Sequence, residues 1–169
     1  MIRVRHPPFR LRRLPGLGVL LLVPTLAAGA AGQAVDDVSR LAGVEHLGAR
    51  VEADWDEAIT VEAGGATEEQ FLQALGSTFE AALSSAETGP RLDDASPVTV
   101  ACHVDTFYET GQILYALRTQ VEATGADRAP VIVWIRSWVG SFTTRQLHLM
   151  FTLGERCAES FLEDWRRVN

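Results

Sequence analysis

A thiol, an imidazole and a carboxylate lie within four residues of this 169-residue chain, in the stretch CHVDTFYE that begins at Cys102. A cysteine beside a histidine is a nucleophile that many enzymes use, and histidine and aspartate both ligate metals. The alternation of residue types here predicts a strand, in which neighbouring side chains point to opposite faces. Cys102 and His103 therefore cannot form a catalytic dyad with each other.

His103 and Asp105 would share the second face of this strand, about 7 Å apart. Two ligands fall short of the three or four that a zinc site requires. His46 and His148 are isolated in the sequence, and neither an HExxH nor a CxxC spacing occurs. We therefore predict no metal, no cofactor and no catalytic residue. A small metal-dependent or hydrolytic enzyme using His103 and Asp105 stays as an alternative, and it requires another histidine to converge on His103.

The two cysteines of the chain, Cys102 and Cys157, are both expected in the interior. Cys102 falls on the apolar face of its strand, and Cys157 lies at the edge of the apolar stripe of the last helix. They can meet between a sheet and a helix, where a disulfide would close a loop of about 55 residues. Two buried free thiols fit the pattern equally well.

A binding surface is predicted in the run PVIVWIRSWVGSF, residues 130–142, because Trp134, Arg136 and Trp138 share one face of a strand. The alternate set is uniformly apolar and is the better core face; it comprises Val131, Val133, Ile135 and Val139. The two tryptophans would then be partly exposed beside the arginine, as a contact for a sugar, a lipid or a protein. The alternative is a strand buried on both faces.

Two amphipathic helices are expected to position these strands. Each begins with a capping box, in which a threonine is followed three residues later by glutamine, at Thr67 and Gln70 and at Thr143 and Gln146. Apolar residues then recur at helical spacing. The first helix should end near residues 88–90 and the second close to the C-terminus.

Strand-like runs cover residues 98–108, 112–122 and 130–142, and an earlier one covers 47–55. The order β-α-β-β-β-α predicts an α+β fold, a two-layer sandwich with a mostly antiparallel sheet and both helices on one face. Residues 54–66 fit a loop or a continuation of the first strand.

The first 34 residues have the composition of a secretory signal peptide: five arginines and no acid, then a short apolar run, then small residues. Cleavage after Ala30 and cleavage after Ala34 both fit. Residues 35–46 would form an N-terminal lead-in and residues 47–169 a single α+β domain. No later apolar run reaches the length of about 20 residues that spans a bilayer, so we expect an exported protein, periplasmic or secreted.

The expected mature chain is strongly acidic. Five of the 15 basic residues lie in the first 34, which leaves 10 against 22 acidic residues and a net charge of −12. Such a chain repels phosphate backbones, so a nucleic-acid partner is not expected. Lysine is absent. A saline habitat and a GC-rich genome both stay open as explanations, although the second does not account for the acidic excess.

Four stretches resemble a loose class of short exported bacterial proteins without an assigned function: RLAGVEHLGARVE, TEEQFLQALGSTFEAAL, VTVACHVDTFYETGQILYALRTQVE and FLEDWRRVN. The order of elements is also similar to small periplasmic accessory domains, such as those of the lipopolysaccharide-assembly lipoprotein and curli-secretion-like families. Those domains commonly carry a lipid anchor, and no anchor cysteine occurs here. The resemblance implies a protein of the cell envelope.

These observations favour a non-enzymatic binding or assembly module whose partner is a protein or another envelope component. A purely structural secreted domain is the remaining alternative. The predicted contact is the surface around Trp134, Arg136 and Trp138.

Overall fold

The computed structural model describes residues 37–62, 64, 66–125 and 129–169. The predicted signal peptide therefore lies outside the described residues. The elements, with η for a 3₁₀ helix, are η1 (Val38–Leu41), β1 (His46–Asp54), α1 (Glu57–Glu62), α2 (Glu68–Ser85), β2 (Arg91–Leu92), β3 (Val98–Glu109), β4 (Gln112–Thr124), β5 (Pro130–Thr143), η2 (Thr144–Thr152) and α3 (Leu153–Arg166). The short η1 lies in the predicted lead-in.

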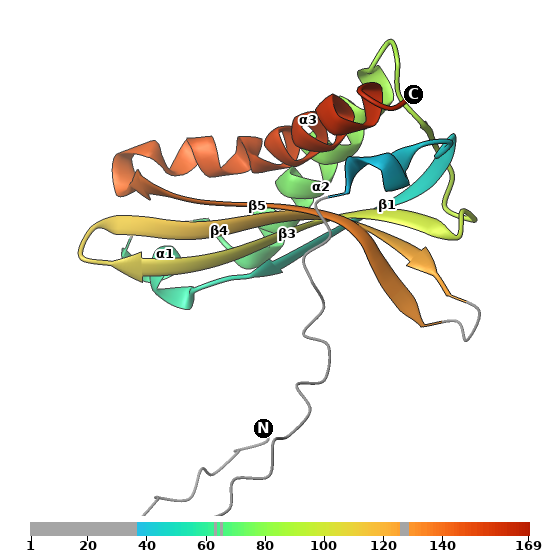
Figure 1. Ribbon diagram of the computed structural model, residues 1–169. Coiled ribbons are helices and arrows are strands. Elements are labelled where there is room, and N and C mark those ends of the chain that lie inside the picture. Colours follow the sequence, from blue (N-terminus) through green and yellow to red (C-terminus); the bar gives the residue numbers. More distant parts are fainter. Residues whose placement is uncertain (1–36, 63, 65, 126–128) are drawn as a thin grey trace, which may run out of the picture. The chain divides into compact units, whose positions relative to one another are not determined.

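The strands form one mixed sheet in the order β2-β1-β3-β4-β5. β3, β4 and β5 make the predicted antiparallel meander, whereas β1 runs parallel to both of its neighbours, β2 and β3. Helices α2 and α3 pack together on one face (Figure 1). The predicted α+β class is confirmed. The short elements α1 and β2 were not predicted, because two to six residues carry no clear periodicity.

The first capping box forms as predicted. The backbone N–H of Gln70 donates to Thr67 Oγ1 at 3.3 Å, and the backbone N–H of Thr67 donates to Gln70 Oε1 at 3.2 Å. Helix α2 then buries one apolar residue on each successive turn, namely Phe71, Leu75, Phe79 and Leu83. It ends at Ser85, earlier than predicted.

The second predicted helix is divided in two. Residues 144–152 form the 3₁₀ helix η2, and the α-helix begins only at Leu153. The transition from 3₁₀ helix to α-helix lies next to the point of closest approach to α2. A Cβ atom on Gly154 would lie 2.2 Å from the carbonyl oxygen of Leu75. Glycine at this position therefore allows the backbones of α2 and α3 to approach closely. None of the helices in the described part of the chain is long and apolar enough to cross a membrane.

The core lies between the sheet and the helices α2 and α3. The predicted alternation along β3 is confirmed, since Val100, Cys102, Val104 and Thr106 are buried. β4 contributes Ile113, Tyr115, Leu117 and Val121 to the same inner face. The opposite face is called the outer face below.

Candidate binding surface

The outer face carries a contiguous apolar patch near the hairpin that joins β3 to β4. Phe107 of β3 lies directly opposite Leu114 of β4, and Ala116 of β4 lies directly opposite Val139 of β5. The exposed fractions are 59% for Phe107, 38% for Leu114 and 85% for Val139. These four residues are called the outer-face patch.

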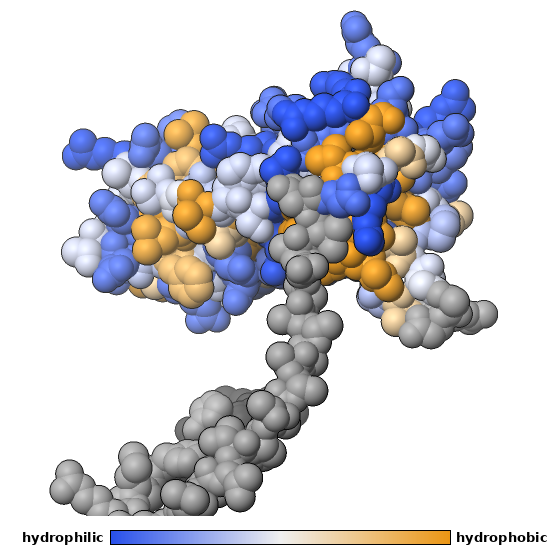
Figure 2. Space-filling view, viewed as in Figure 1, coloured by the Kyte–Doolittle hydropathy of each residue, from blue (hydrophilic) through white to orange (hydrophobic). Residues whose placement is uncertain are grey.

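The outer-face patch lines a shallow groove of about 450 Å³, together with Tyr115, Gly140 and Ser141. Figure 2 shows some apolar surface at this end of the sheet and a larger apolar area near the first half of β5. Isolated exposed apolar side chains are ordinary on protein surfaces, but neighbouring ones around a concavity are typical of interaction sites. The geometry of the groove therefore suits a ligand that brings its own apolar surface.

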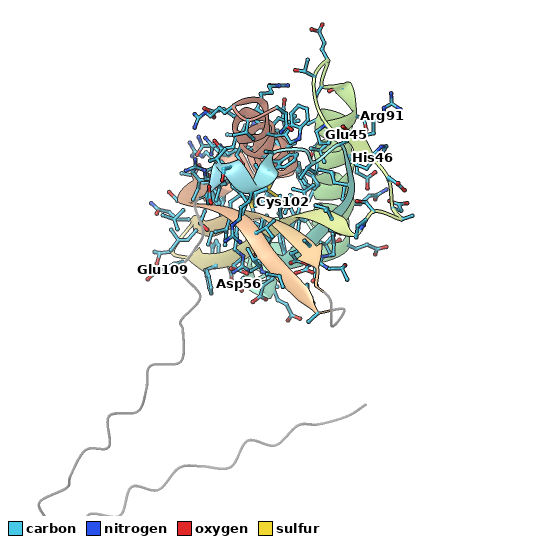
Figure 3. The ribbon with its side chains drawn as sticks, turned by 45° about the vertical axis from the view of Figure 1, so that its right-hand side comes forward. Glu45, His46, Asp56, Arg91, Cys102 and Glu109 are labelled. Carbon is cyan, nitrogen blue, oxygen red and sulfur yellow. A yellow bond between two sulfur atoms is a disulfide. The ribbon has the colours of Figure 1, made fainter. Side chains whose placement is uncertain are left out.

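Charged side chains border the outer-face patch. Asp105 lies opposite Ala116, and Asp54 lies opposite Asp105 one strand further on. Glu109 follows Phe107 on the same face, and Figure 3 shows it at the end of the sheet. Neither Asp54 nor Glu109 makes an ion pair within the described residues. Arg118 is the cation next to the patch, and its buried Nε has no hydrogen-bond partner in the described part of the chain.

His103 is held between two carboxylates on the outer face. Its Nδ1 lies 3.0 Å from Glu52 Oε2, and its Nε2 lies 2.9 Å from Asp105 Oδ1. Arg50 completes the row, with Nε 2.9 Å from Glu52 and Nη2 3.1 Å from Glu122. The row links β1, β3 and β4 by hydrogen bonds and ion pairs.

The residues required for the alternative enzyme hypothesis do not converge. His46 precedes Glu52 by six positions in β1, so it lies about 20 Å along the strand from the row of His103. His148 lies in η2, which packs on the helical side of the sheet against α2 and α3. Among the described residues, no group of three or more His, Cys, Asp or Glu residues could hold a metal ion.

The predicted partial exposure is wrong for Trp134, whereas Trp138 is partly exposed as predicted. Trp134 is fully buried, and its Nε1 donates to Asp164 Oδ2 at 3.2 Å. Arg136 Nε lies 2.8 Å from the same oxygen, and Trp138 is half-buried against the core. The three residues therefore share the inner face with the core, and Val139 is exposed on the other face.

A register shift interrupts the pairing of β4 with β5 just before Trp134. Val121 pairs with Trp134, but the next residue, Glu122, pairs with Ile132. Val133 is left without a partner, so strict alternation along β5 fails at this point. The buried Asp164 satisfies the indole N–H, which lets the larger Trp134 ring occupy the core.

Sequence reasoning did not single out Phe107 and Leu114, and it wrongly placed Val139, which is 85% exposed, on the core face. Their signal was nevertheless present, because apolar residues stand side by side in each strand, as in Phe107–Tyr108, Ile113–Leu114 and Trp138–Val139. Adjacent apolar residues in a strand occupy both faces. With helices on one face alone, one member of each pair is left on the outer face.

Cys102 and Cys157 are joined by a disulfide, with an S–S distance of 2.05 Å. Both are fully buried, and Figure 3 shows Cys102 in the interior between the sheet and the helices. The sequence was compatible with a disulfide and with two buried free thiols, and the structure contains the disulfide. It connects β3 to α3.

Comparisons with known proteins give structural neighbours alone. No family model matches the chain, and no curated protein matches it. Among solved structures, it is similar to a PelC variant dodecamer from Paraburkholderia phytofirmans, at 12% identity over 72% of this chain and 90% of that one, with a TM-score of 0.43. It is also similar to a protein described as uncharacterized, at 13% identity over 74% of this chain and 92% of that one, with a TM-score of 0.39.

Proposed function

We propose that this protein is a non-enzymatic, exported module of the cell envelope that binds a protein partner through the outer-face patch. One observation carries the proposal: the face of the sheet opposite α2 and α3 bears exposed apolar side chains in register around a groove. The sequence predicted a contact surface at Trp134, Arg136 and Trp138, on the inner face of β5. The proposed contact surface lies on the outer face of the same sheet.

Exposure of the outer-face patch is unfavourable for the free protein. Burial of apolar surface contributes about 25 cal/mol per Å², so a side chain such as Val139, with 85% exposed, stabilises a complex that covers it. Interfaces of this kind combine an apolar centre with a polar border. The groove and its charged surroundings have this composition.

Two observations support export. Cys102 and Cys157 form a buried disulfide, and disulfides persist mainly in oxidising compartments such as the periplasm and the extracellular medium. The N-terminal sequence has the three-part composition of a signal peptide.

The proposal is tested by capture from the envelope fraction of the organism that encodes the protein. The bait carries Phe107→Ser and Val139→Ser together, and the control bait carries Val61→Ser. Val61 is 76% exposed in α1 and does not line the groove, so it is a matched apolar surface residue.

We expect the wild type and the Val61→Ser bait to retain the same protein, and the double variant to lose most of it. Urea unfolding of each bait checks that the fold is intact. Equal capture by all three baits would contradict the proposal and favour a purely structural domain or another surface.

A further inference from the structure

We infer that the partner segment which covers the outer-face patch is cationic, with apolar side chains followed by arginine or lysine. This inference rests on the proposed function and adds the chemistry of the partner. It is carried by the charges that remain unpaired around the patch and by the net charge of the chain.

The outer face has more carboxylates than cations. The carboxylates are Glu52, Asp54, Asp105, Glu109 and Glu122, and the guanidinium groups are Arg50 and Arg118. Arg50 pairs with two of these carboxylates, Glu52 and Glu122, and His103 contacts Glu52 and Asp105. Asp54 and Glu109 are left as exposed carboxylates without an ion pair in the described part of the chain.

The register fixes where a cation of the partner would lie. Asp54, Asp105, Ala116 and Val139 form one row across β1, β3, β4 and β5. Neighbouring strands are about 4.8 Å apart, so Asp54 lies about 14 Å from Val139 across the sheet. An extended segment covers this distance in about four residues. An apolar side chain over Val139 therefore places a residue about four positions away beside Asp54.

The charge of the whole chain favours the same partner. Residues 35–169 carry a net charge of −12, which attracts cationic segments over long range and repels a second copy of the chain. An anionic membrane surface is repelled in the same way. A cationic protein segment is therefore the occupant that the local and the overall charge both favour.

The test uses the purified protein and three synthetic peptides that differ at one type of position. In each peptide, leucine occupies the position expected over Val139. The residue four positions away, expected beside Asp54, is arginine in one peptide, serine in the second and glutamate in the third. Binding is measured by fluorescence anisotropy at low salt. We expect the arginine peptide to bind about fivefold more tightly than the serine peptide, and the glutamate peptide to bind most weakly.

Two variants locate the effect. Asp54→Asn with Glu109→Gln should remove the preference for arginine over serine and leave binding of the serine peptide unchanged. Val139→Ser should weaken binding of the arginine and serine peptides alike, and Val61→Ser should change neither. High salt should remove the preference, because exposed ion pairs are screened.

Three results would overturn the inference: no binding of any peptide, equal binding of all three, or a preference that survives in the Asp54 and Glu109 variant. Patch-dependent binding to zwitterionic lipid vesicles in place of the peptides would also overturn it. If capture from the envelope depends on the patch but the peptides show no charge preference, only the partner's chemistry is wrong. If capture does not depend on the patch, the proposed function fails.

Discussion

At the scale of single residues, Asp164 is a buried carboxylate that three donors contact. It is almost completely buried in α3, and its carboxylate accepts from Trp134 Nε1 at 3.2 Å, Arg136 Nε at 2.8 Å and Arg167 Nη1 at 3.0 Å. A buried carboxylate is tolerated when charged donors satisfy it in this way. Asp164 thereby connects β5 to α3 and holds Trp134 in the core.

Replacement of this carboxylate should destabilise the fold. We expect Asp164→Asn to lower the free energy of unfolding by at least about 2 kcal/mol, because Asn removes a buried negative charge that Arg136 and Arg167 both contact. The control is Glu163→Gln, which removes an exposed partner of Arg167 and should cost less than about 0.5 kcal/mol. Urea unfolding measures both, and equal losses would contradict the role of Asp164.

Asp56 lies just after the end of β1, where it accepts hydrogen bonds from β3 and from the start of α1. Its Oδ2 accepts from the backbone N–H of Tyr108 at 2.8 Å, and its Oδ1 accepts from that of Ala58 at 2.9 Å. These hydrogen bonds, the one from Tyr108 first, hold the pKa of Asp56 below its ordinary value. The charged form is therefore favoured in the folded state over the unfolded state.

The stabilisation from Asp56 should depend on pH. Since the pKa is lowered by folding, the stabilisation is fully present above the ordinary aspartate pKa of about 3.9 and is lost as pH falls through the lower folded value. Asp56→Asn should lower the urea midpoint relative to wild type at about pH 6, and this difference should shrink below about pH 3. A difference that stays constant across this range would exclude the charge as its source.

At the scale of elements, the disulfide determines how the sheet and the last helix stay together. Cys102 and Cys157 are 55 positions apart, and they fasten β3, in the middle of the sheet, to α3. A link over this distance restricts the unfolded chain strongly. Both cysteines belong to the same hydrophobic core as Phe161 and Leu117.

Removal of the disulfide should be among the largest single effects on stability. We expect Cys102→Ala with Cys157→Ala to lower the free energy of unfolding by about 4 kcal/mol in the chain-entropy model. A reductant should shift the urea midpoint of the wild type toward that of the variant and leave the variant unchanged. If thiol reagents label both cysteines of the unreduced wild type in denaturant, the bridge is absent.

At the scale of the whole molecule, local patterns predicted local structure. The capping box of Thr67 and Gln70 and the alternation around Cys102 depend on neighbouring residues, and both formed as predicted. The faces of β5 were predicted wrongly, because they depend on the pairing with β4 and on the hydrogen bond that Trp134 donates to Asp164, 30 residues away. The outer-face patch depends on which face the helices cover, and no short stretch of sequence contains that information.

The parallel pairing of β1 with β3 was not predicted for the same reason, because it depends on residues far apart in the sequence. β1 pairs with β3 across α1 and α2, so its direction follows from a connection of more than 40 residues. Hairpins are specified by the few residues of a turn, as at Thr110 and Gly111, whose positive φ angles fit the tight link between β3 and β4. A long crossover carries no comparable local signal.

A protein partner that covers the outer-face patch in the envelope can be detected by site-specific photo-cross-linking. A photoreactive amino acid replaces Val139 in the patch or, as the control, Val61 in α1, and the native envelope is irradiated. We expect a cross-linked protein from position 139 and none from position 61, with a linked segment that carries apolar residues and arginine or lysine. The absence of a product at position 139, or the same product at both positions, would contradict this expectation.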